Sequence, residues 1–231
     1  MLTVDALDQY YGQSHTLRDV TLDVPRGECT VLMGRNGVGK TTLLQCVTGL
    51  LPVRGGRIRL ADEDITSLPA ERRAAAGIGY VPQGRQIFPR LSVEENLRIG
   101  LPARRDGVRT IPPEIHELFP VLADMRQRRG GDLSGGQQQQ LAIGRALATG
   151  PDVLLLDEPT EGIQPNVVAE IGDIVVRLTR EIGLTVLLVE QKLAFARRVG
   201  DRFALMDRGH VVASGAMDNL DDDLVRLHLT V

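Results

Sequence analysis

The segment Gly34–Thr41 constrains the fold of this chain more than any other stretch, because it reads Gly-Arg-Asn-Gly-Val-Gly-Lys-Thr. It fits the pattern G-x-x-x-x-G-K-[ST], follows an apolar run and precedes a helix-like segment. This order predicts a strand, a phosphate-binding loop and a helix in succession. The glycines allow backbone N–H groups to converge on the phosphates of a nucleotide. A chance glycine-rich turn is the alternative, and the flanking strand and helix disfavour it.

The residues of this loop have separate expected roles. Lys40 places a positive charge beside the β- and γ-phosphates, and Thr41 offers its hydroxyl to Mg²⁺. Thr42 is placed to reach the α-phosphate. The expected nucleotide-binding residues of this segment are Gly34, Arg35, Asn36, Gly37, Val38, Gly39, Lys40, Thr41 and Thr42.

Four continuously apolar runs are typical of strands buried on both faces of a parallel sheet. They are Cys29–Met33, Ile78–Val81, Val153–Leu156 and Thr185–Val189. Polar residues follow each run: the glycine loop, Gln83, the pair Asp157 and Glu158, and the pair Glu190 and Gln191. Because ligands of open α/β sheets bind beyond the carboxyl ends of the strands, we expect these side chains to meet at one edge.

The two acidic residues after the third run fit different parts of a hydrolysis reaction. Asp157 ends the strand, as expected for a carboxylate that holds Mg²⁺ through water. Glu158 follows immediately and is placed to orient or deprotonate an attacking water. A charged pair that merely keeps a strand end soluble is the alternative, and the nearby phosphate loop disfavours it.

A second glycine-rich helix start occurs at Leu133–Gln137, which reads Leu-Ser-Gly-Gly-Gln. Ser134 is a natural helix N-cap, and that is the simplest interpretation. Gly135 and Gly136 leave backbone donors unobstructed at the positive end of the helix, where an anion is favoured. This loop has no ligand of its own, so it predicts a partner whose nucleotide site it completes.

Composition narrows the classes of function. The chain has 231 residues, a formal net charge of −3 and no long basic block, which gives no general attraction to nucleic acid or anionic lipid. The amino terminus lacks the pattern of a secretory signal, and the longest apolar runs are too short to span a bilayer. Cys29 and Cys46 lie in apolar runs and are expected to be buried thiols in a reducing compartment.

Taken together, the motifs resemble the ATP-binding subunit of ABC transporters over nearly the whole chain. In order, they are Tyr11, Gly34–Thr41, Gln83, Leu133–Gln137, Val153–Glu158 and Gln191. The resemblance implies ATP and Mg²⁺ as cofactors and two ATP molecules bound between two ATPase subunits. Ser134, Gly135, Gly136 and Gln137 of one subunit then face the phosphate loop of the other.

The resemblance also implies roles for two residues outside these loops. Tyr11 corresponds to the aromatic that stacks on adenine, although neighbouring Tyr10 is an alternative. Gln83 corresponds to the glutamine that contacts Mg²⁺ and the attacking water and joins the helical insert to the sheet. The expected catalytic residues are Glu158, Gln191, Gln83 and Lys40, and the expected metal ligands are Thr41, Gln83 and Asp157.

Two positions depart from the common family pattern. Gln191 stands where most members have a histidine that contacts the γ-phosphate, and glutamine donates a hydrogen bond but does not titrate. Gln164 replaces the usual aspartate of the loop that crosses the dimer interface. Val189-Glu190-Gln191 and the segment Gly79–Leu91 are similar to ATPases of the branched-chain amino acid and urea uptake branch. Glu161–Pro165 is most similar to the urea-type subunit.

The expected fold is α/β, with a P-loop NTPase (RecA-like) core, an antiparallel β subdomain and a helical insert of the ABC ATPase type. We expect one domain over residues 1–231. Residues 1–84 and 141–231 form its nucleotide-binding core, and residues 85–140 form a helical subdomain. Antiparallel β structure is expected up to about residue 30 and over Gly56–Leu60, and Ser92–Glu95 has the pattern of a capping box.

The leading hypothesis is the motor subunit of an importer for urea, amides or branched-chain amino acids, held at the cytoplasmic face of the inner membrane. Its expected partners are a second ATPase subunit, identical or related, two membrane permease subunits and, indirectly, a solute-binding protein. Ile87, Phe88 and Leu91 either form part of the groove that grips the permease or belong to the core of the insert. A soluble ABC-type ATPase acting on nucleic acid or ribosomes is the alternative. An ordinary P-loop kinase or GTPase leaves Ser134–Gly136 unexplained.

Overall fold

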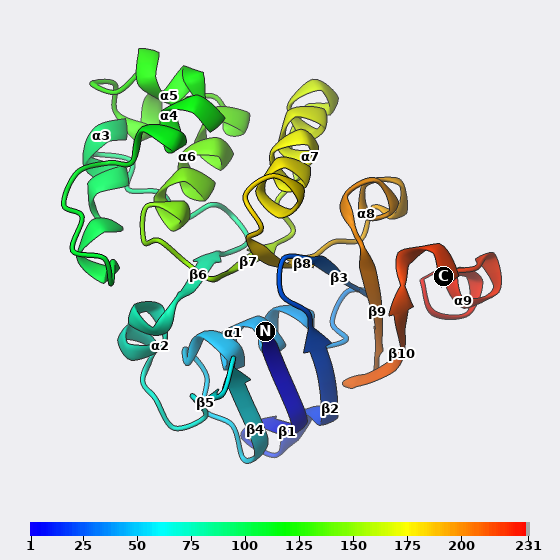
Figure 1. The fold of residues 1–231 in the computed structure, drawn as a ribbon. Helices are drawn as coiled ribbons and strands as arrows, with labels where there is room; N and C mark the ends of the chain where they lie inside the picture. The colour runs from blue at the N-terminus through cyan, green and yellow to red at the C-terminus, as the bar shows by residue number, and fades with distance from the viewer. Residues whose placement is uncertain (230–231) are drawn as a thin grey trace.

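The computed structural model describes residues 1–229, which form two β-sheets and surrounding helices (Figure 1). The larger sheet has the order β10-β9-β3-β8-β7-β6, and the smaller has the order β2-β1-β4-β5. The strands are β1 (Leu2–Tyr11), β2 (Ser14–Val24), β3 (Cys29–Met33), β4 (Gly55–Leu60), β5 (Glu63–Asp64), β6 (Ile78–Val81), β7 (Val153–Asp157), β8 (Thr185–Val189), β9 (Arg202–Asp207) and β10 (His210–Ala216).

The four predicted parallel strands are confirmed as β3, β6, β7 and β8 of the larger sheet. Their side chains are almost all buried, because helices or the second sheet cover both faces. The amino-terminal antiparallel part ends at Val24, earlier than the predicted limit near residue 30. The reason is that Cys29–Met33 pairs in parallel with β8 and β9.

Nine α-helices are described in residues 1–229. They are α1 (Lys40–Thr48), α2 (Ala70–Ala76), α3 (Val93–Arg98), α4 (Pro113–Leu118), α5 (Pro120–Asp124), α6 (Gly135–Leu147), α7 (Pro165–Arg180), α8 (Leu193–Val199) and α9 (Asp222–His228). Helices α3 to α6 gather at one end of the molecule, and the smaller sheet lies at the other (Figure 1).

The segment between β6 and β7 is mostly helical, as its sequence predicts. The capping box of α3 forms in both directions: the Ser92 side chain accepts from the Glu95 N–H, and the Glu95 side chain accepts from the Ser92 N–H. Pro120 divides the helical pattern into α4 and α5. The predicted subdomain limit at residue 140 lies inside α6, and the division into subdomains stays a prediction.

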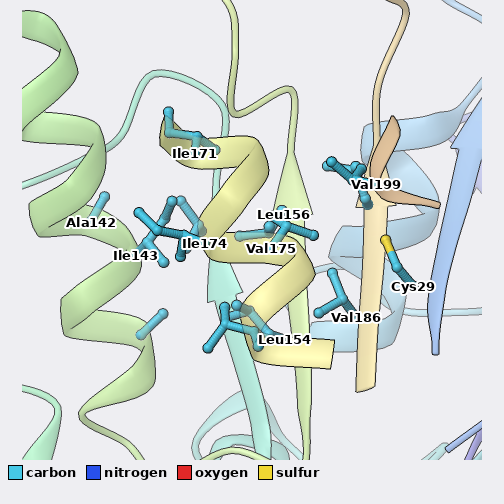
Figure 2. Close-up of a cluster of buried hydrophobic side chains, with 14 of the residues drawn as sticks. Cys29, Ala142, Ile143, Leu154, Leu156, Ile171, Ile174, Val175, Val186 and Val199 are labelled. Carbon is cyan, nitrogen blue, oxygen red and sulfur yellow. The ribbon is translucent and has the colours of Figure 1, made fainter. Parts of the chain in front are cut away.

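Two hydrophobic cores flank the larger sheet. One packs its upper face against α6, α7 and α8, with Ile143, Ile174 and Leu154 among its members (Figure 2). The other lies between the opposite face, α1 and the smaller sheet. Cys29 and Cys46 are buried in these cores, as expected. Burial raises the pKa of both thiols, that of Cys46 to about 12, so both remain protonated at neutral pH.

A buried arginine closes the carboxyl-terminal end of α1, the helix that carries the phosphate loop. Arg73 is 4% exposed. Its Nη1 donates to the carbonyls of Cys46 (2.6 Å) and Val47 (3.0 Å) at the end of α1. Its Nε and Nη2 donate to the carbonyls of Leu68 (2.8 Å) and Thr66 (2.7 Å). A cation here satisfies carbonyls that a helix end leaves unpaired and opposes the negative end of the helix dipole.

Replacing Arg73 with alanine is expected to lower the free energy of unfolding by about 3 kcal/mol or more, because the carbonyls of four residues lose a hydrogen bond from this buried guanidinium. Urea denaturation followed by circular dichroism measures the loss. Arg72→Ala is the matched control, since the neighbouring Arg72 is exposed. Equal unfolding midpoints for the two variants would show that Arg73 does not stabilise α1.

Candidate nucleotide-binding site

A cleft of about 630 Å³ lies beyond the carboxyl ends of the central strands. It collects residues that follow β3, β6, β7 and β8, so the predicted convergence at one sheet edge is confirmed. Its lining residues are Thr16, Asn36, Gly37, Gly39, Lys40, Thr41, Thr42, Gln83, Glu158, Thr160, Glu161, Glu190, Gln191 and Lys192.

The loop Gly34–Gly39 connects β3 to α1, and two of its glycines are required by close approach of other parts of the chain. A Cβ on Gly34 would lie 2.4 Å from the Met206 carbonyl oxygen. Gly39 has a φ of +111°, and a Cβ there would lie 2.9 Å from a Leu17 methyl. The loop therefore wraps tightly around the start of α1, with the positive end of the helix at the cleft.

Lys40 is the first residue of α1, and its side chain folds back along the loop. Its Nζ donates to the carbonyls of Gly34 (2.7 Å) and Arg35 (2.8 Å). Burial lowers the pKa of this ammonium, and the charges of Glu158 and Asp157 act in the opposite direction. Lys40 thus braces the loop and places a cation at the floor of the cleft.

Thr41 and Asp157 lie together beside the phosphate loop. The Thr41 hydroxyl donates to Asp157 Oδ1 at 3.2 Å, and the Tyr80 hydroxyl donates to Oδ2 at 3.5 Å. Burial raises the pKa of Asp157 to about 6. A divalent cation beside this carboxylate would favour its ionised form and lower that pKa.

The donors in this part of the cleft suit Mg²⁺, which prefers oxygen ligands and binds through one or two carboxylates plus the phosphates of a substrate. Thr41 and Asp157 supply a hydroxyl and a carboxylate oxygen in contact with each other. Within residues 1–229, no group of three or more histidine, cysteine or acidic residues is arranged to hold a metal without a substrate.

Glu158 and Gln191 come from neighbouring strands and meet at the mouth of the cleft. Gln191 Nε2 donates to Glu158 Oε1 at 2.5 Å. The Glu158 N–H donates to the Val189 carbonyl at 3.0 Å, and Glu158 has a left-handed backbone with φ of +47°. Such a conformation is costly for a side-chain-bearing residue and is found disproportionately at functional sites. The amide of Gln191 therefore orients the acid predicted to act on water.

Gln83 also lines the cleft, where its Nε2 donates to Glu161 Oε2 at 2.8 Å. This bond links the segment after β6 to the segment after β7. The bond uses the amide nitrogen, so Oε1, the atom through which Gln83 is predicted to contact a metal, is not engaged by it.

The two tyrosines at the end of β1 differ in their surroundings. The Tyr10 ring stacks on His15, with ring centroids 4.1 Å apart. Tyr11 is 48% exposed, and its hydroxyl lies 3.5 Å from Gln45 Oε1 on α1. Because Tyr10 is already engaged, the geometry favours Tyr11 as the ring available to a base.

Ser134, Gly135, Gly136 and Gln137 lie outside the cleft that holds the phosphate loop. Ser134 Oγ accepts from the Gln137 N–H at 3.3 Å, and Gln137 Oε1 accepts from the Ser134 N–H at 3.0 Å. This is a complete capping box for α6. A Cβ on Gly136 would lie 2.7 Å from a Val167 methyl of α7, so close packing within this chain accounts for that glycine.

Five residues line the cleft without having been assigned a role from the sequence: Thr16, Thr160, Glu161, Glu190 and Lys192. One signal was available: Lys40 and Lys192 are the only lysines of the chain, and both lie here. Glu190 gave no signal of its own, because a polar residue is expected after any buried strand.

The glycine loop, the sheet edge and the acidic pair define a P-loop nucleotide-binding protein of the α/β class. The model of the family described as "ABC transporter" matches residues 17–161, more than half of the chain. The chain therefore belongs to the ABC transporter family, as an ATP-binding subunit, and is an ATP-hydrolysing enzyme.

The matches to three relatives cover nearly the full length of both proteins. The high-affinity branched-chain amino acid transport ATP-binding protein BraG of Pseudomonas aeruginosa is 41% identical, over 92% of this chain and 91% of its own. The probable branched-chain amino acid transport ATP-binding protein LivF of Archaeoglobus fulgidus is 37% identical, over 95% and 94%. The lipopolysaccharide export system ATP-binding protein LptB of Escherichia coli is 37% identical, over 99% and 96%.

A solved structure supports the same fold. The dimeric structure of a post-hydrolysis state of an ATP-binding cassette with ADP and Pi superposes with a TM-score of 0.82 at 25% identity. The match covers 94% of this chain and 99% of that one. The expected ABC ATPase fold is thereby confirmed.

Proposed function

We propose that this chain is the motor subunit of an importer of small polar solutes, with branched-chain amino acids as the solute class best supported. The observation that carries the proposal is the cleft that brings the phosphate loop together with the paired Glu158 and Gln191, beside Asp157, in a chain 41% identical to BraG. Urea or a short-chain amide is the finer proposal, and it rests on the similarity of Glu161–Pro165 to the urea-type subunit.

In the proposed reaction, the loop Gly34–Gly39 and the start of α1 receive the phosphates of ATP. Lys40 moves its ammonium from the loop carbonyls to the β- and γ-phosphates, and Thr42 reaches the α-phosphate. Thr41, Asp157 and Gln83 would hold Mg²⁺, which would supply positive charge to neutralise the phosphates. Catalysis then consists mainly of positioning and electrostatic stabilisation.

Glu158 accepts a proton from the attacking water as the γ-phosphoryl group is transferred. Gln191 has two amide hydrogens, so it can hold Glu158 with one and donate to the γ-phosphate with the other. Because an amide does not titrate, position 191 contributes no pH dependence near neutrality. The adenine stacks on Tyr11, a contact worth about 1–3 kcal/mol if it resembles base stacking elsewhere.

A second ATPase subunit is needed to complete this site, because Ser134–Gln137 lies outside the cleft of its own chain. The capped start of α6 presents backbone donors at the positive end of a 13-residue helix. Across a dimer, these donors meet the γ-phosphate held by the partner subunit. The dimeric form of the similar cassette with ADP and Pi supports this arrangement.

The proposed permease contact is a second hollow of about 420 Å³, beside the segment that carries Gln83. Phe88, Ile99 and Leu50 line it and are 45%, 44% and 57% exposed. The Arg145 guanidinium lies 5.1 Å from the centre of the Phe88 ring. Ile87, in contrast, packs against the core, so Phe88 belongs to the groove and Ile87 to the insert.

Among residues 1–229, no helix is both long and apolar enough to cross a membrane. We propose attachment to the cytoplasmic face of the inner membrane through two permease subunits, and the similarity to transport ATP-binding proteins supports this. The soluble alternative, an ATPase acting on nucleic acid or ribosomes, is not favoured by the relatives or by a net charge of −3.

Replacing Phe88 with aspartate is expected to reduce co-purification with a membrane permease at least about tenfold, because a buried charge at the contact costs more than 1.4 kcal/mol. Affinity capture from solubilised membranes, followed by mass spectrometry, measures the loss. Ile182→Asp is the control, since Ile182 is 55% exposed and lies outside the hollow. ATP-dependent capture of DNA or ribosomes instead of a permease would support the soluble alternative.

A further inference from the structure

Thr160, Glu190 and Lys192 form a hydrogen-bonded cluster between the segments that follow β7 and β8; we name these three residues the inter-loop cluster. The segment after β7 carries Glu158, and the segment after β8 carries Gln191. Glu190 is 3% exposed, although it lines the same cleft as the exposed Gln191. Burying a carboxylate is costly unless hydrogen bonds stabilise it.

Both oxygens of the Glu190 carboxylate are used. Oε2 accepts from the buried Thr160 hydroxyl at 2.7 Å. Oε1 accepts from the backbone N–H groups of Gln191 at 2.8 Å and Lys192 at 3.0 Å. Lys192 Nζ donates in return to the Thr160 carbonyl at 3.0 Å. The inter-loop cluster therefore ties the two segments together by side-chain and backbone bonds.

These contacts fix the backbone position of Gln191, from which its side chain extends. The Gln191 N–H is held by Glu190 Oε1, and the Gln191 amide reaches Glu158 Oε1 at 2.5 Å. The Glu190 N–H donates to the Leu32 carbonyl at 3.2 Å, which anchors the backbone of residue 190 to β3. The backbone of residue 191 is thus fixed from the sheet side, while its side chain stays free to touch Glu158.

We propose that Glu190 is a positioning residue for ATP hydrolysis: through the Gln191 N–H and the Thr160 hydroxyl, it sets the Gln191 amide against Glu158. The proposal rests on the hydrolytic role proposed above for Glu158. Both carboxylate oxygens of Glu190 are bonded to protein groups, so in this proposal its effect passes through Gln191.

Glu190 could act by positioning Gln191 or by its negative charge. The two roles predict opposite orders of ATPase activity for Glu190→Gln and Glu190→Asp. In Glu190→Gln, the amide oxygen can still accept both backbone N–H groups, and its NH₂ can donate to the Thr160 hydroxyl oxygen. In Glu190→Asp, the charge remains, but the shorter side chain cannot reach the backbone of the segment after β8 and Thr160 together. A positioning role therefore predicts that Glu190→Gln is active and Glu190→Asp is impaired.

The experiment measures kcat and KM for Mg-ATP in the full-length wild type, Glu190→Gln, Glu190→Asp and Glu190→Ala. Each substitution is also made in a Gln191→Ala background. We expect kcat to fall about tenfold or more in Glu190→Ala and Glu190→Asp, to stay within about threefold in Glu190→Gln, and KM to change little throughout. In the Gln191→Ala background, adding Glu190→Ala should lower kcat by less than a further factor of about three. The reason is that both substitutions remove the same function, the contact of the Gln191 amide with Glu158.

Glu117→Ala serves as the control, because Glu117 is an exposed acid on α4. The positioning role is overturned if Glu190→Asp is active while Glu190→Gln is not, or if the losses of Glu190→Ala and Gln191→Ala multiply. It is equally overturned if Gln191→Ala alone keeps full activity. A wild type that fails to hydrolyse ATP would contradict the proposed function itself, which separates the two failures.

Discussion

Replacing Glu158 with glutamine is expected to lower kcat for ATP hydrolysis by about 100-fold or more, because the amide cannot accept the proton of the attacking water. ATP binding should persist, since Lys40 and the phosphate loop are unchanged. The variant should therefore accumulate as an ATP-bound dimer. Phosphate release measures the rate, and light scattering with and without Mg-ATP measures the assembly.

Glu161→Gln is the matched control for this variant. Glu161 lies in the same segment and lines the same cleft, but its carboxylate accepts from Gln83, not from Gln191. Its loss of rate should be far smaller than that of Glu158→Gln. An ATP-insensitive monomer in the Glu158 variant would contradict the proposed two-subunit site.

Replacing Lys40 with alanine is expected to weaken ATP binding by about 30-fold or more, equivalent to at least about 2 kcal/mol for a charge pair in a partly closed site. The variant also loses the bonds from Nζ to the carbonyls of Gly34 and Arg35, which leaves the loop less well ordered. Titration of a fluorescent ATP analogue gives the affinity directly.

Lys192→Ala is the natural comparison, because Lys40 and Lys192 are the only lysines and both line the cleft. The Lys192 ammonium donates to the Thr160 carbonyl, so it organises the protein and not the phosphates. We expect a much smaller loss of ATP affinity for Lys192→Ala. Equal losses in the two variants would show that the cradle does not depend specifically on Lys40.

The strands that carry the site were predictable because they are buried on both faces. Runs such as Val153–Leu156 and Thr185–Val189 show no alternation, and the residues that follow them meet where parallel strands end. The starts of α3 and α6 were also predictable, since Ser92 with Glu95 and Ser134 with Gln137 satisfy local backbone groups within one turn.

Other features depend on contacts between distant segments, and no local pattern reports them. Glu190 is held by Thr160, which is 30 residues away in sequence. Arg73 reaches Cys46 across 27 residues. The Gln191 amide was expected at the γ-phosphate, and its bond to Glu158 emerged only from the packing of β7 beside β8. The roles assigned to the individual site residues stay predictions until the variants above are measured.

Helix α6 runs unbroken from Gly135 to Leu147, a length of about 20 Å at 1.5 Å per residue. Its first turn is capped by Ser134, and its last turn carries Arg145, which lies over Phe88 and donates to the Gln86 carbonyl at 2.9 Å. Because all 13 residues are α-helical, the two ends of α6 belong to one continuous element. If the first turn faces a neighbour's nucleotide, as proposed, a tilt imposed there displaces the other end of α6, which lies beside the hollow lined by Phe88.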